Sequence, residues 1–471
     1  MRALPVFCLR RRGGLIYNVR MAIKDNYLLA KSAADMLEKA MPIRLGVNKS
    51  NELVRLVYEI SRREGVPAAT VLEEAGVYLL DDPGGAFHRI KEALLGRRYP
   101  SRQDGDKVRI MPVKMGSGSK ECSLWEGKLS PGKIFVEKSV LSFEWTRDFL
   151  RNFPNAEVHE ADSLGKAARM ARLSGGIEEY NRRRETLFIT ANKAAFIKKC
   201  PCTRDARRCG YWVLNLGFGC PFDCSYCYLQ TYNDIPGLVF TANIDDYYRH
   251  IMDFDAVAAK GLRIGTGEFT DSLALDAYTG YARKLIGFFR SARNLVLELK
   301  TKTAEIENVL KEEPHENVVI SWSINTPSLA QAFEKGASGV RDRIEAARQA
   351  ALKGYSVAFH FDPVIWREGW EKEYRDITAE LFSSREIREK AAWVSLGTLR
   401  YSPGLKQAAE QRFENNSMYY DGEFFLDFDG KFRYPESLRK NIYSKMRQFL
   451  REAGAKCWIY LCMEPSRLWE D

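Results

Sequence analysis

The sequence predicts an α/β protein whose largest domain is an open or partial (β/α) barrel with six strands. Six short apolar stretches read as strands, and helix-like stretches such as YARKLIGFFRSA and VRDRIEAARQAALKG separate most of them. Parallel strands need such crossover helices, so the alternation favours a parallel sheet. In a barrel of this kind the chemistry lies at the C-terminal ends of the strands. The predicted strands are residues 212–218, 262–266, 295–300, 317–325, 356–362 and 393–399.

Changes in the pattern of apolar and polar residues indicate the domain boundaries on both sides of this barrel. The stretch NELVRLVYEISRREGV carries a helical stripe that includes Leu53, Leu56 and Ile60, and a Gly- and Ser-rich stretch follows at residues 115–133. Three strand-like stretches, KIFVEKSVL, AEVHEA and TLFITAN, then precede the barrel. We therefore predict a helical N-terminal extension and linker (1–131), a small α/β subdomain with a Cys-rich segment (132–210), the barrel (211–400), and a C-terminal region suited to binding substrate or DNA (401–471).

Composition and charge narrow the class of protein. The chain has 471 residues, of which 45% are hydrophobic and 12% aromatic, and this excludes global disorder. No apolar stretch approaches the ~18–20 residues of a transmembrane helix, and the first residues lack the pattern of a secretory signal. We therefore expect a cytoplasmic protein with no membrane partner, whose ten cysteines serve metal or redox chemistry rather than disulfides. The net charge of +10 fits an anionic partner such as nucleic acid and fits ordinary solubility nearly as well.

Six of the ten cysteines fall between Cys200 and Cys227. Among them, Cys220, Cys224 and Cys227 form a C-x3-C-x2-C spacing directly after the first barrel strand. Three thiolates on one short loop can bind three irons of a 4Fe–4S cluster, which leaves the fourth iron open to a small molecule with an amine and a carboxylate. A structural zinc site needs a fourth ligand and usually has paired C-x2-C units, so the spacing favours the cluster. The other four cysteines read as buried free thiols: Cys8, Cys122, Cys457 and Cys462.

This motif, with an aromatic residue just before its last cysteine, resembles that of the radical S-adenosylmethionine (SAM) superfamily. GCPFDCSYCYLQTY, followed in order by TDSLALD, ELKTK, SWSIN and REGWEKEY, is similar to the spore photoproduct lyase family of that superfamily, over residues 132–435. The resemblance implies a partial (β/α)6 radical SAM barrel and reductive cleavage of SAM to a 5′-deoxyadenosyl radical that abstracts hydrogen from the substrate. It also implies repair of a thymine dimer in DNA, with an electron donor such as flavodoxin or ferredoxin.

The resemblance assigns roles to individual residues. Cys220, Cys224 and Cys227 match the cluster ligands, and Tyr226 matches an aromatic residue that packs against the adenine of SAM. Tyr226 and Tyr228 together match a hydrogen-relay pair and are the predicted catalytic residues, although simple packing remains the alternative for Tyr228 and for Asn325. The further positions that match the surroundings of SAM are Thr270, Lys302, Ser323 and Asn325.

One position departs from the family pattern. Where the lyases place a cysteine that donates hydrogen to the product radical, this chain has Glu268. A carboxylate cannot donate a hydrogen atom as a thiol does. The Gly267-Glu268 pair at the end of the second strand resembles instead a superfamily motif whose glutamate accepts hydrogen bonds from the ammonium group of SAM. We therefore predict Glu268 as a SAM ligand, and either another group such as Tyr228 quenches the radical or the substrate differs.

Two further segments carry separate predictions. Cys200, Cys202 and Cys209 could hold a zinc ion or a second cluster with a fourth ligand from elsewhere, although structural or redox thiols are the alternative. The segment Gly430–Tyr434 offers basic and aromatic groups for phosphates and an extruded base.

Three hypotheses for the function remain at this point. The first is a DNA-repair enzyme of the spore photoproduct lyase type, and the second is a radical SAM enzyme that acts on another nucleic-acid lesion, a modified RNA or a peptide. The third is a cluster protein that senses redox state or binds DNA without catalysis, and the residues predicted around SAM argue against it. The stretch GTGEFTD lacks the glycine spacing of a dinucleotide-binding loop, and this excludes a dinucleotide-binding protein.

Overall fold

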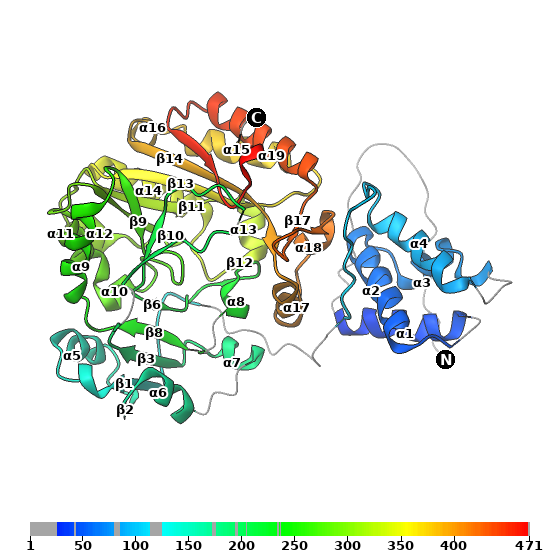
Figure 1. Cartoon of the computed structure of the whole chain (residues 1–471), viewed down its shortest axis with the longest axis horizontal. Coiled ribbons are helices and arrows are strands. Elements are labelled where there is room, and N and C mark those ends of the chain that lie inside the picture. The colour runs from blue at the N-terminus through cyan, green and yellow to red at the C-terminus, as the bar shows by residue number, and fades with distance from the viewer. Residues whose placement is uncertain are drawn as a thin grey trace.

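The computed structural model describes residues 26–41, 44–79, 85–113, 125–171, 176–193, 196–203, 205–232, 235 and 237–469. These residues form a helical N-terminal unit, a smaller sheet and a larger curled sheet that carries helices on its outside (Figure 1). The predicted α/β architecture is therefore confirmed. Cys8, Cys122 and much of the predicted linker lie outside the described residues.

The N-terminal unit consists of the helices that the apolar stripe predicts. Leu53, Leu56 and Ile60 lie on one side of the second helix and are all buried. This helix ends at Gly65, whose φ of 70° lies in the left-handed region that glycine adopts without strain. The helices are α1 (Asn26–Ala40), α2 (Val47–Glu64), α3 (Ala68–Glu74) and α4 (Ala86–Arg98), with a 3-10 turn η1 (Val77–Leu79).

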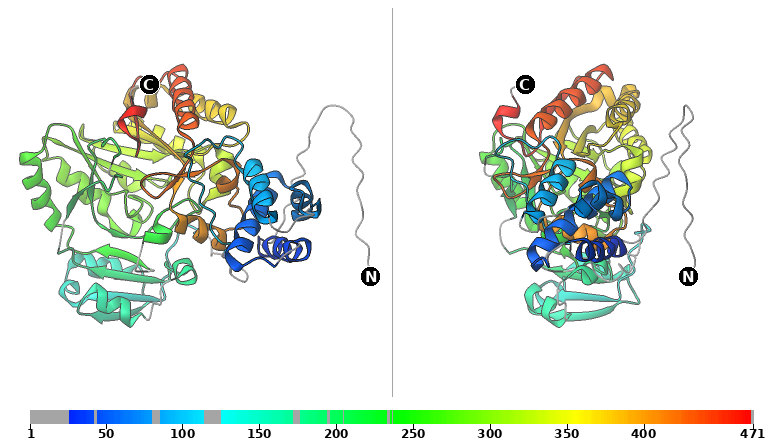
Figure 2. Two further views of the ribbon diagram at one scale, coloured as in Figure 1. Left: turned by 45° about the vertical axis from the view of Figure 1, so that its right-hand side comes forward. Right: turned by 90° about the vertical axis from the view of Figure 1, so that its right-hand side faces the viewer.

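This unit lies beside α17 (Pro403–Arg412), as Figure 2 shows, and a buried ion network joins the two. Arg55 on α2 donates to both carboxylate oxygens of Glu410 at 2.6 and 3.0 Å. Glu59, one turn further along α2, lies 2.9 Å from Arg98 Nε and 2.5 Å from Lys406 Nζ. Because the charges alternate in sign, each buried group has a partner, which offsets its cost of desolvation.

The smaller sheet has the strand order β2-β1-β3-β8-β6 and lies below the larger sheet in Figure 1. Its first four strands are parallel and β6 is antiparallel to β8. Since β6 and β8 come from within the predicted barrel segment, the sheet crosses the boundary predicted at residue 210. The elements are β1 (Lys133–Glu137), η2 (Lys138–Val140), α5 (Glu144–Arg151), β2 (Glu157–Ala161), α6 (Leu164–Met170), α7 (Ile177–Asn181), β3 (Thr186–Thr190), β6 (Gly217–Phe218) and β8 (Leu238–Thr241).

The larger sheet has the strand order β18-β14-β13-β11-β10-β9-β5-β4. All neighbours are parallel except β4 and β5, so β4 and β18 are the two edge strands. A strand of this sheet lies at each of the six predicted positions, but the first ends at Leu214, and residues 217–218 form β6 in the smaller sheet. β18 adds a seventh parallel strand. Its short apolar run, WIYL, gave no alternation to identify it. The strands are β4 (Ile197–Lys199), β5 (Trp212–Leu214), β9 (Leu262–Gly265), β10 (Leu295–Thr301), β11 (Val318–Ser323), β13 (Ser356–Val364), β14 (Ala391–Thr398) and β18 (Trp458–Leu461).

Helices between these strands cover the sheet, and the chain then turns into a small C-terminal sheet. Within the described ranges, no helix combines the length and the apolar character needed to cross a bilayer. The helices are α9 (Asp246–Val257), α10 (Asp276–Thr279), α11 (Tyr281–Phe289), α12 (Glu307–Lys311), α13 (Pro327–Phe333), α14 (Val340–Lys353), α15 (Trp370–Leu381), α16 (Arg385–Lys390) and α19 (Glu436–Glu452). The small sheet and its neighbours are β15 (Arg400–Tyr401), α18 (Met418–Asp421), β16 (Phe425–Leu426), β17 (Phe432–Arg433) and η3 (Ser466–Leu468).

Candidate active site

The three motif cysteines lie on one loop, residues 219–228, which we call the cluster loop. Within it, β7 (Asp223–Cys224) pairs with β12 (Glu334–Lys335), and α8 (Leu229–Tyr232) follows directly. Cys224 is buried, and Cys220 and Cys227 are half-buried. Burial raises the pKa of Cys224 to about 12, and burial with the charges of Asp271, Cys227 and Cys224 raises that of Cys220. The three cysteines therefore lie on one short loop in surroundings that are buried or half-buried.

This donor set fits a 4Fe–4S cluster. Three thiolates on one short loop can each bind a different iron, whereas a structural zinc site needs a fourth ligand. Among the described residues, no group of three or more His, Cys, Asp or Glu side chains is arranged to hold a metal ion.

Three arginines hold the cluster loop by binding the carboxylate of Asp223 and the backbone carbonyl of Cys220. Asp223 accepts hydrogen bonds from Arg184 Nη1 at 2.7 Å and from Arg412 Nη2 at 2.5 Å, and Arg183 Nη2 lies 2.9 Å from it. Arg183 also donates to the backbone carbonyl of Cys220 at 2.9 Å. These arginines lower the pKa of Asp223 although burial acts in the opposite direction, so the carboxylate stays charged.

Polar side chains fix the second half of the loop as well. The side-chain amide of Gln230 donates to the carbonyl oxygens of Cys224, Ser225 and Cys227 at 3.0–3.2 Å. The buried Tyr419 hydroxyl donates to Ser225 O at 3.0 Å. The backbone that carries the cysteines is thus held by protein groups alone, which is how a binding loop is preorganised.

The hydroxyl of Tyr226 contacts a buried, charged side chain near the cysteines. Its hydroxyl donates to Glu334, whose other oxygen lies 2.6 Å from Arg343 Nη2. Lys302 Nζ lies 5.7 Å from the centre of the Tyr226 ring. Burial lowers the pKa of Lys302, but Cys224 and Glu334 raise it above its ordinary value, so the ammonium stays charged. The structure therefore brings Tyr226 and Lys302 together next to the cysteines.

Tyr228 and Glu268 are in direct contact on the other side of the loop. The Tyr228 hydroxyl donates to the backbone carbonyl of Glu268 at 2.5 Å and lies 3.2 Å from its carboxylate. Tyr228 is 38% exposed, and its ring meets that of Tyr232 edge to face. Tyr232, which the sequence analysis did not single out, stacks on Phe269 and is 58% exposed.

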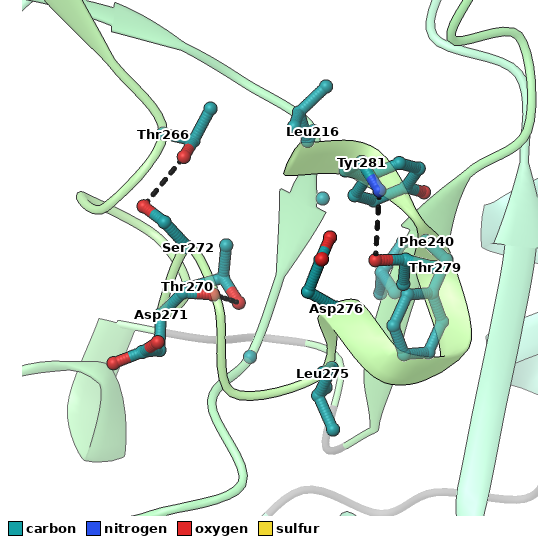
Figure 3. A pocket seen from close by; sticks show the side chains of 13 residues that line it. Leu216, Phe240, Thr266, Thr270, Asp271, Ser272, Leu275, Asp276, Thr279 and Tyr281 are labelled. Carbon is teal, nitrogen blue, oxygen red and sulfur yellow. Dashed lines mark hydrogen bonds between the residues drawn. The ribbon is translucent and has the colours of Figure 1, made fainter. Parts of the chain in front are cut away.

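Thr270 lies on the turn after β9, and Asp271 shapes that turn (Figure 3). Asp271 accepts from the backbone of Ala274 at 2.9 Å and of Lys302 at 2.8 Å, and from the Thr301 hydroxyl at 2.6 Å. It thereby ties the turn to the end of β10 and places Thr270 and Lys302 on the same side of the barrel. Sequence analysis missed Asp271, although an Asp that starts a tight turn after a strand is a recognisable signal.

The cavity beside Thr270, drawn in Figure 3, is too small for a cofactor. Its volume is about 30 Å³, and its lining includes Thr266, Ser272 and Tyr281. Ligand pockets have about 300–1,000 Å³, whereas a water molecule needs only about 10–15 Å³. This cavity is therefore a small gap between the two sheets.

Ser323 and Asn325 lie at the end of β11, and both are buried. The backbone carbonyl of Ser323 accepts from Arg343 Nη1 at 3.0 Å. Asn325 accepts from the Tyr374 hydroxyl at 2.7 Å and donates to Pro363 O at 3.4 Å. These two contacts agree with packing, the alternative that the sequence left open for Asn325, and the contact with SAM stays a prediction.

The inside of the barrel contains charged pairs that sequence analysis did not predict. Glu298 lies 2.6 Å from His360 Nε2, and Asp362 binds Arg400 through both oxygens at 3.0 and 3.2 Å. Burial lowers the pKa of Lys300, but Glu268 and Glu298 raise it above the ordinary value. These residues alternate with buried apolar ones along β10 and β13, so their side chains line one face of each strand.

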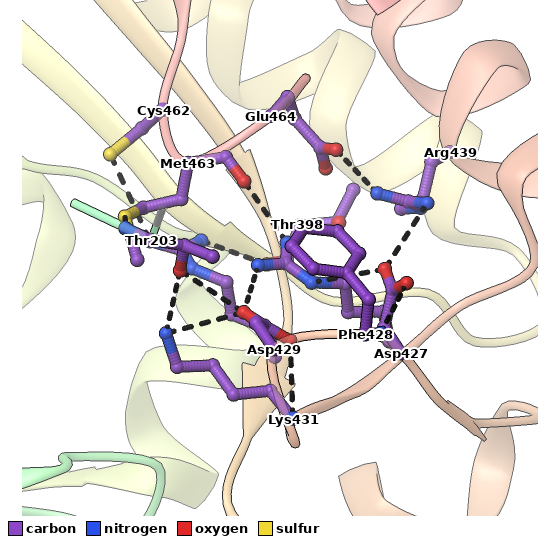
Figure 4. A network of polar contacts seen from close by, with 12 residues as sticks. Thr203, Thr398, Asp427, Phe428, Asp429, Lys431, Arg439, Cys462, Met463 and Glu464 are labelled. Carbon is purple, nitrogen blue, oxygen red and sulfur yellow. Dashed lines mark hydrogen bonds and ion pairs between the residues drawn. The ribbon is translucent and has the colours of Figure 1, made fainter. Parts of the chain in front are cut away.

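The predicted base-contacting segment, Gly430–Tyr434, is only partly available. Phe432, Arg433 and Tyr434 are buried, because Tyr434 accepts from the backbone of Trp366 at 3.1 Å and Arg433 binds Asp429 at 2.8 Å. The prediction is therefore wrong for these three side chains. The exposed aromatic group of this hairpin is Phe428, which is 55% exposed at the turn between β16 and β17 (Figure 4).

Comparison with known proteins agrees with this architecture. A model of the family described as spore photoproduct lyase matches residues 129–453. The spore photoproduct lyase of Clostridium acetobutylicum is 25% identical over 317 residues, which cover 66% of this chain and 90% of the relative. The enzyme of Bacillus subtilis is 24% identical over 339 residues, which cover 69% and 93%.

Solved structures show the same fold. A spore photoproduct lyase complexed with dinucleoside spore photoproduct superposes with a TM-score of 0.61 at 21% identity, over 71% of this chain and 99% of that one. A variant with bound AdoMet and dinucleoside spore photoproduct gives a TM-score of 0.59 at 21% identity, over 70% and 98%. The N-terminal helices lie before the matched family region. From residue 129 to 453, this chain belongs to the spore photoproduct lyase family.

Proposed function

We propose that this protein is a radical SAM enzyme that repairs the spore photoproduct, a thymine dimer, in DNA. The observation that carries the proposal is the preorganised cluster loop with Cys220, Cys224 and Cys227, beside Glu268 and Lys302. A cluster held by these cysteines and reduced by a donor such as flavodoxin or ferredoxin supplies the electron that cleaves SAM to methionine and a 5′-deoxyadenosyl radical.

The chain's own residues bind and orient SAM in this proposal. Glu268 accepts hydrogen bonds from the ammonium group, and Lys302, charged despite its burial, faces the carboxylate. Tyr226 packs against the adenine while its hydroxyl stays on Glu334. Thr270 and Ser323 complete the polar contacts from the ends of β9 and β11.

Of the two predicted catalytic tyrosines, Tyr228 is the better placed to relay hydrogen. Its hydroxyl is at the surface of the site and contacts Glu268, whereas the hydroxyl of Tyr226 is committed to the buried Glu334. For the DNA, the exposed rings of Tyr232 and Phe428 are suited to stacking on an extruded base. The net charge of +10 favours approach to the phosphate backbone.

One observation favours a second candidate function. Glu268 occupies the place of the lyase hydrogen donor and is bonded to Tyr228, and neither group is a thiol. A radical SAM enzyme of this fold that acts on a different nucleic-acid lesion, a modified RNA or a peptide would not need that thiol.

The test uses the full chain, reconstituted without oxygen, reduced with dithionite and mixed with SAM and dinucleoside spore photoproduct. We expect 5′-deoxyadenosine and repaired thymine, quantified by mass spectrometry, and neither product from Cys224→Ala. Deoxyadenosine without repair would favour the second candidate function. No deoxyadenosine from a protein with a verified cluster would contradict both.

A further inference from the structure

The N-terminal helical unit lies before the part of the chain that matches the family, yet it contacts the helices that support the cluster loop. The match begins at residue 129, whereas the unit consists of α1 to α4. Helix α17 lies between α2 and α8, the helix that follows the cluster loop (Figure 1). Two buried routes of hydrogen bonds lead from the unit to the loop, one through α17 and one through α18.

The first route begins on α2. Arg55 binds both carboxylate oxygens of Glu410 on α17, and its Nε donates to Met111 O at 2.7 Å. Glu410 also accepts from the Tyr420 hydroxyl at 2.6 Å. Arg55 is 1% exposed and Glu410 is 4% exposed, so water does not compete for these bonds. The position of α17 is therefore tied to that of α2.

Arg412, the last residue of α17, extends this support to the cluster loop. Its Nη2 donates to Asp223 and its Nη1 donates to the side-chain oxygen of Gln230, both at 2.5 Å. Because Arg412 binds the oxygen of this amide, the amide nitrogen faces away from it and donates to three backbone carbonyls of the loop. Arg412 thus holds two side chains that hold the loop.

The second route runs through α18. Arg98 on α4 donates to the carbonyl oxygens of Tyr419 and Gly422 at 3.3 and 3.1 Å. The hydroxyl of the fully buried Tyr419 donates in turn to Ser225 O, between two of the motif cysteines. The N-terminal unit therefore reaches the backbone of the cluster loop at a second point.

Both routes end on Asp223 and on backbone carbonyls of residues 224–227. This short stretch carries two of the cysteines and Tyr226, whereas Glu268 and Lys302 follow other strands, β9 and β10. A shift of the stretch would therefore move the cluster relative to the residues proposed to bind SAM. Reactive groups must be held within about 0.5 Å of their productive positions, so the support bears on reactivity as well as on folding.

We propose that the N-terminal helical unit positions the cluster loop for SAM cleavage. Arg55, Glu410 and Arg412 are the positioning residues of the first route, and Arg98 and Tyr419 are those of the second. The inference rests on the proposed function only in its first step, the binding and cleavage of SAM. It makes the chemistry of the cluster depend on a part of this chain that lies outside the family region.

The first test breaks the first route at its far end. Arg55→Met removes the ion pair with α17 and leaves every direct contact of the loop in place. In the metal-free full chain, exchange of the hydrogen-bonded amides of Ser225 and Cys227 should rise roughly tenfold. Arg439→Met, the matched control, changes another buried arginine that binds a glutamate, Glu464, and should leave this exchange unchanged. Circular dichroism checks that both variants fold.

The same variants are then loaded with the cluster and reduced. Arg55→Met should bind as much iron as the unaltered protein, but the electron paramagnetic resonance spectrum of its cluster with SAM should differ, and kcat for deoxyadenosine formation should fall roughly tenfold. A unit that only stabilises the fold would change neither. Unchanged exchange and an unchanged spectrum would overturn the proposal. Because exchange in the metal-free chain needs neither SAM nor DNA, this outcome is distinct from a failure of the proposed function.

A second pair of variants tests the other route and does not depend on the folding of Arg55→Met. Tyr419→Phe removes the hydrogen bond to Ser225 O and keeps the ring. Tyr355→Phe removes a comparable bond, from a buried hydroxyl to Val309 O at 3.0 Å, and is the matched control. Only Tyr419→Phe should raise exchange at Ser225 and alter the spectrum of the cluster. The same result in both variants would contradict the proposal.

Discussion

The cluster loop and the Cys-rich segment before it, residues 200–203 and 205–209, are held in different ways. The loop carries its three cysteines within eight residues. Arg183 and Gln230 donate to its backbone carbonyls, and Arg412 binds the carboxylate of Asp223 on the same loop. The Cys-rich segment follows the edge strand β4 and contacts Met463 and Glu464 after β18. The cluster loop is thus preorganised for binding.

The largest effect should come from the cluster loop. Cys224→Ala removes the most buried of the three ligands, so reductive SAM cleavage should fall to the rate without enzyme. Deoxyadenosine formation in reduced protein measures this. Cys457→Ala, which lies outside both cysteine groups, should cleave SAM at the normal rate; equal losses in both variants would refute the role of the loop.

The next effect tests the ion pairs between Asp223 and three arginines that hold the cluster loop. Asp223→Asn leaves three buried arginines without their carboxylate, so the free energy of unfolding should fall by about 3–5 kcal/mol. Arginines hold the pKa of Asp223 below its ordinary value, so its contribution is present above about pH 4 and is lost as the pH falls through the folded pKa.

Denaturant unfolding of the metal-free protein at several pH values measures this contribution. The difference between the unaltered protein and Asp223→Asn should shrink below about pH 4, because the carboxyl then gains a proton in the unfolded chain before it does so in the folded protein. A difference that grows as the pH falls would contradict the charged network.

A smaller effect should follow from a change of Glu268, the predicted ligand of the SAM ammonium group. Glu268→Gln removes a charge that we assign to the ammonium group, and hydrogen bonds to charged groups contribute about 1.5–3 kcal/mol, so SAM should bind roughly 10- to 100-fold more weakly. Equilibrium binding to the reconstituted protein measures this. Glu316→Gln, an exposed carboxylate at the other end of β11, is the matched control and should not change the affinity.

The smallest effect concerns metal removal. After chelation of all iron, amide hydrogen exchange should change little in the cluster loop, where Ser225 N donates to Phe333 O at 2.8 Å. A rise of about tenfold or more in the loop would mean that the loop is ordered by metal.

The parts that the sequence predicted are those encoded locally. The C-x3-C-x2-C spacing, the six predicted strands and the turn positions Glu268 and Thr270 are each visible within a few residues. The parts that it missed depend on segments far apart in the chain. Glu334 reaches Tyr226 only because β12 pairs with β7.

Burial explains the remaining error. Phe432, Arg433 and Tyr434 have the composition of a base-binding segment, but the short strand β17 lies between β15 and β16, so their side chains pack inward. Composition cannot say which face of a two-residue strand meets solvent, because alternation needs a longer run.

The most direct measurement of the central claim is electron–nuclear double resonance on the reduced protein with SAM labelled with 15N in its amine and 17O in its carboxylate. If Cys220, Cys224 and Cys227 leave one iron open to SAM, both labels should couple to the cluster spin, and both couplings should disappear in Cys224→Ala. An intact reduced cluster with no coupling to either label would contradict the claim.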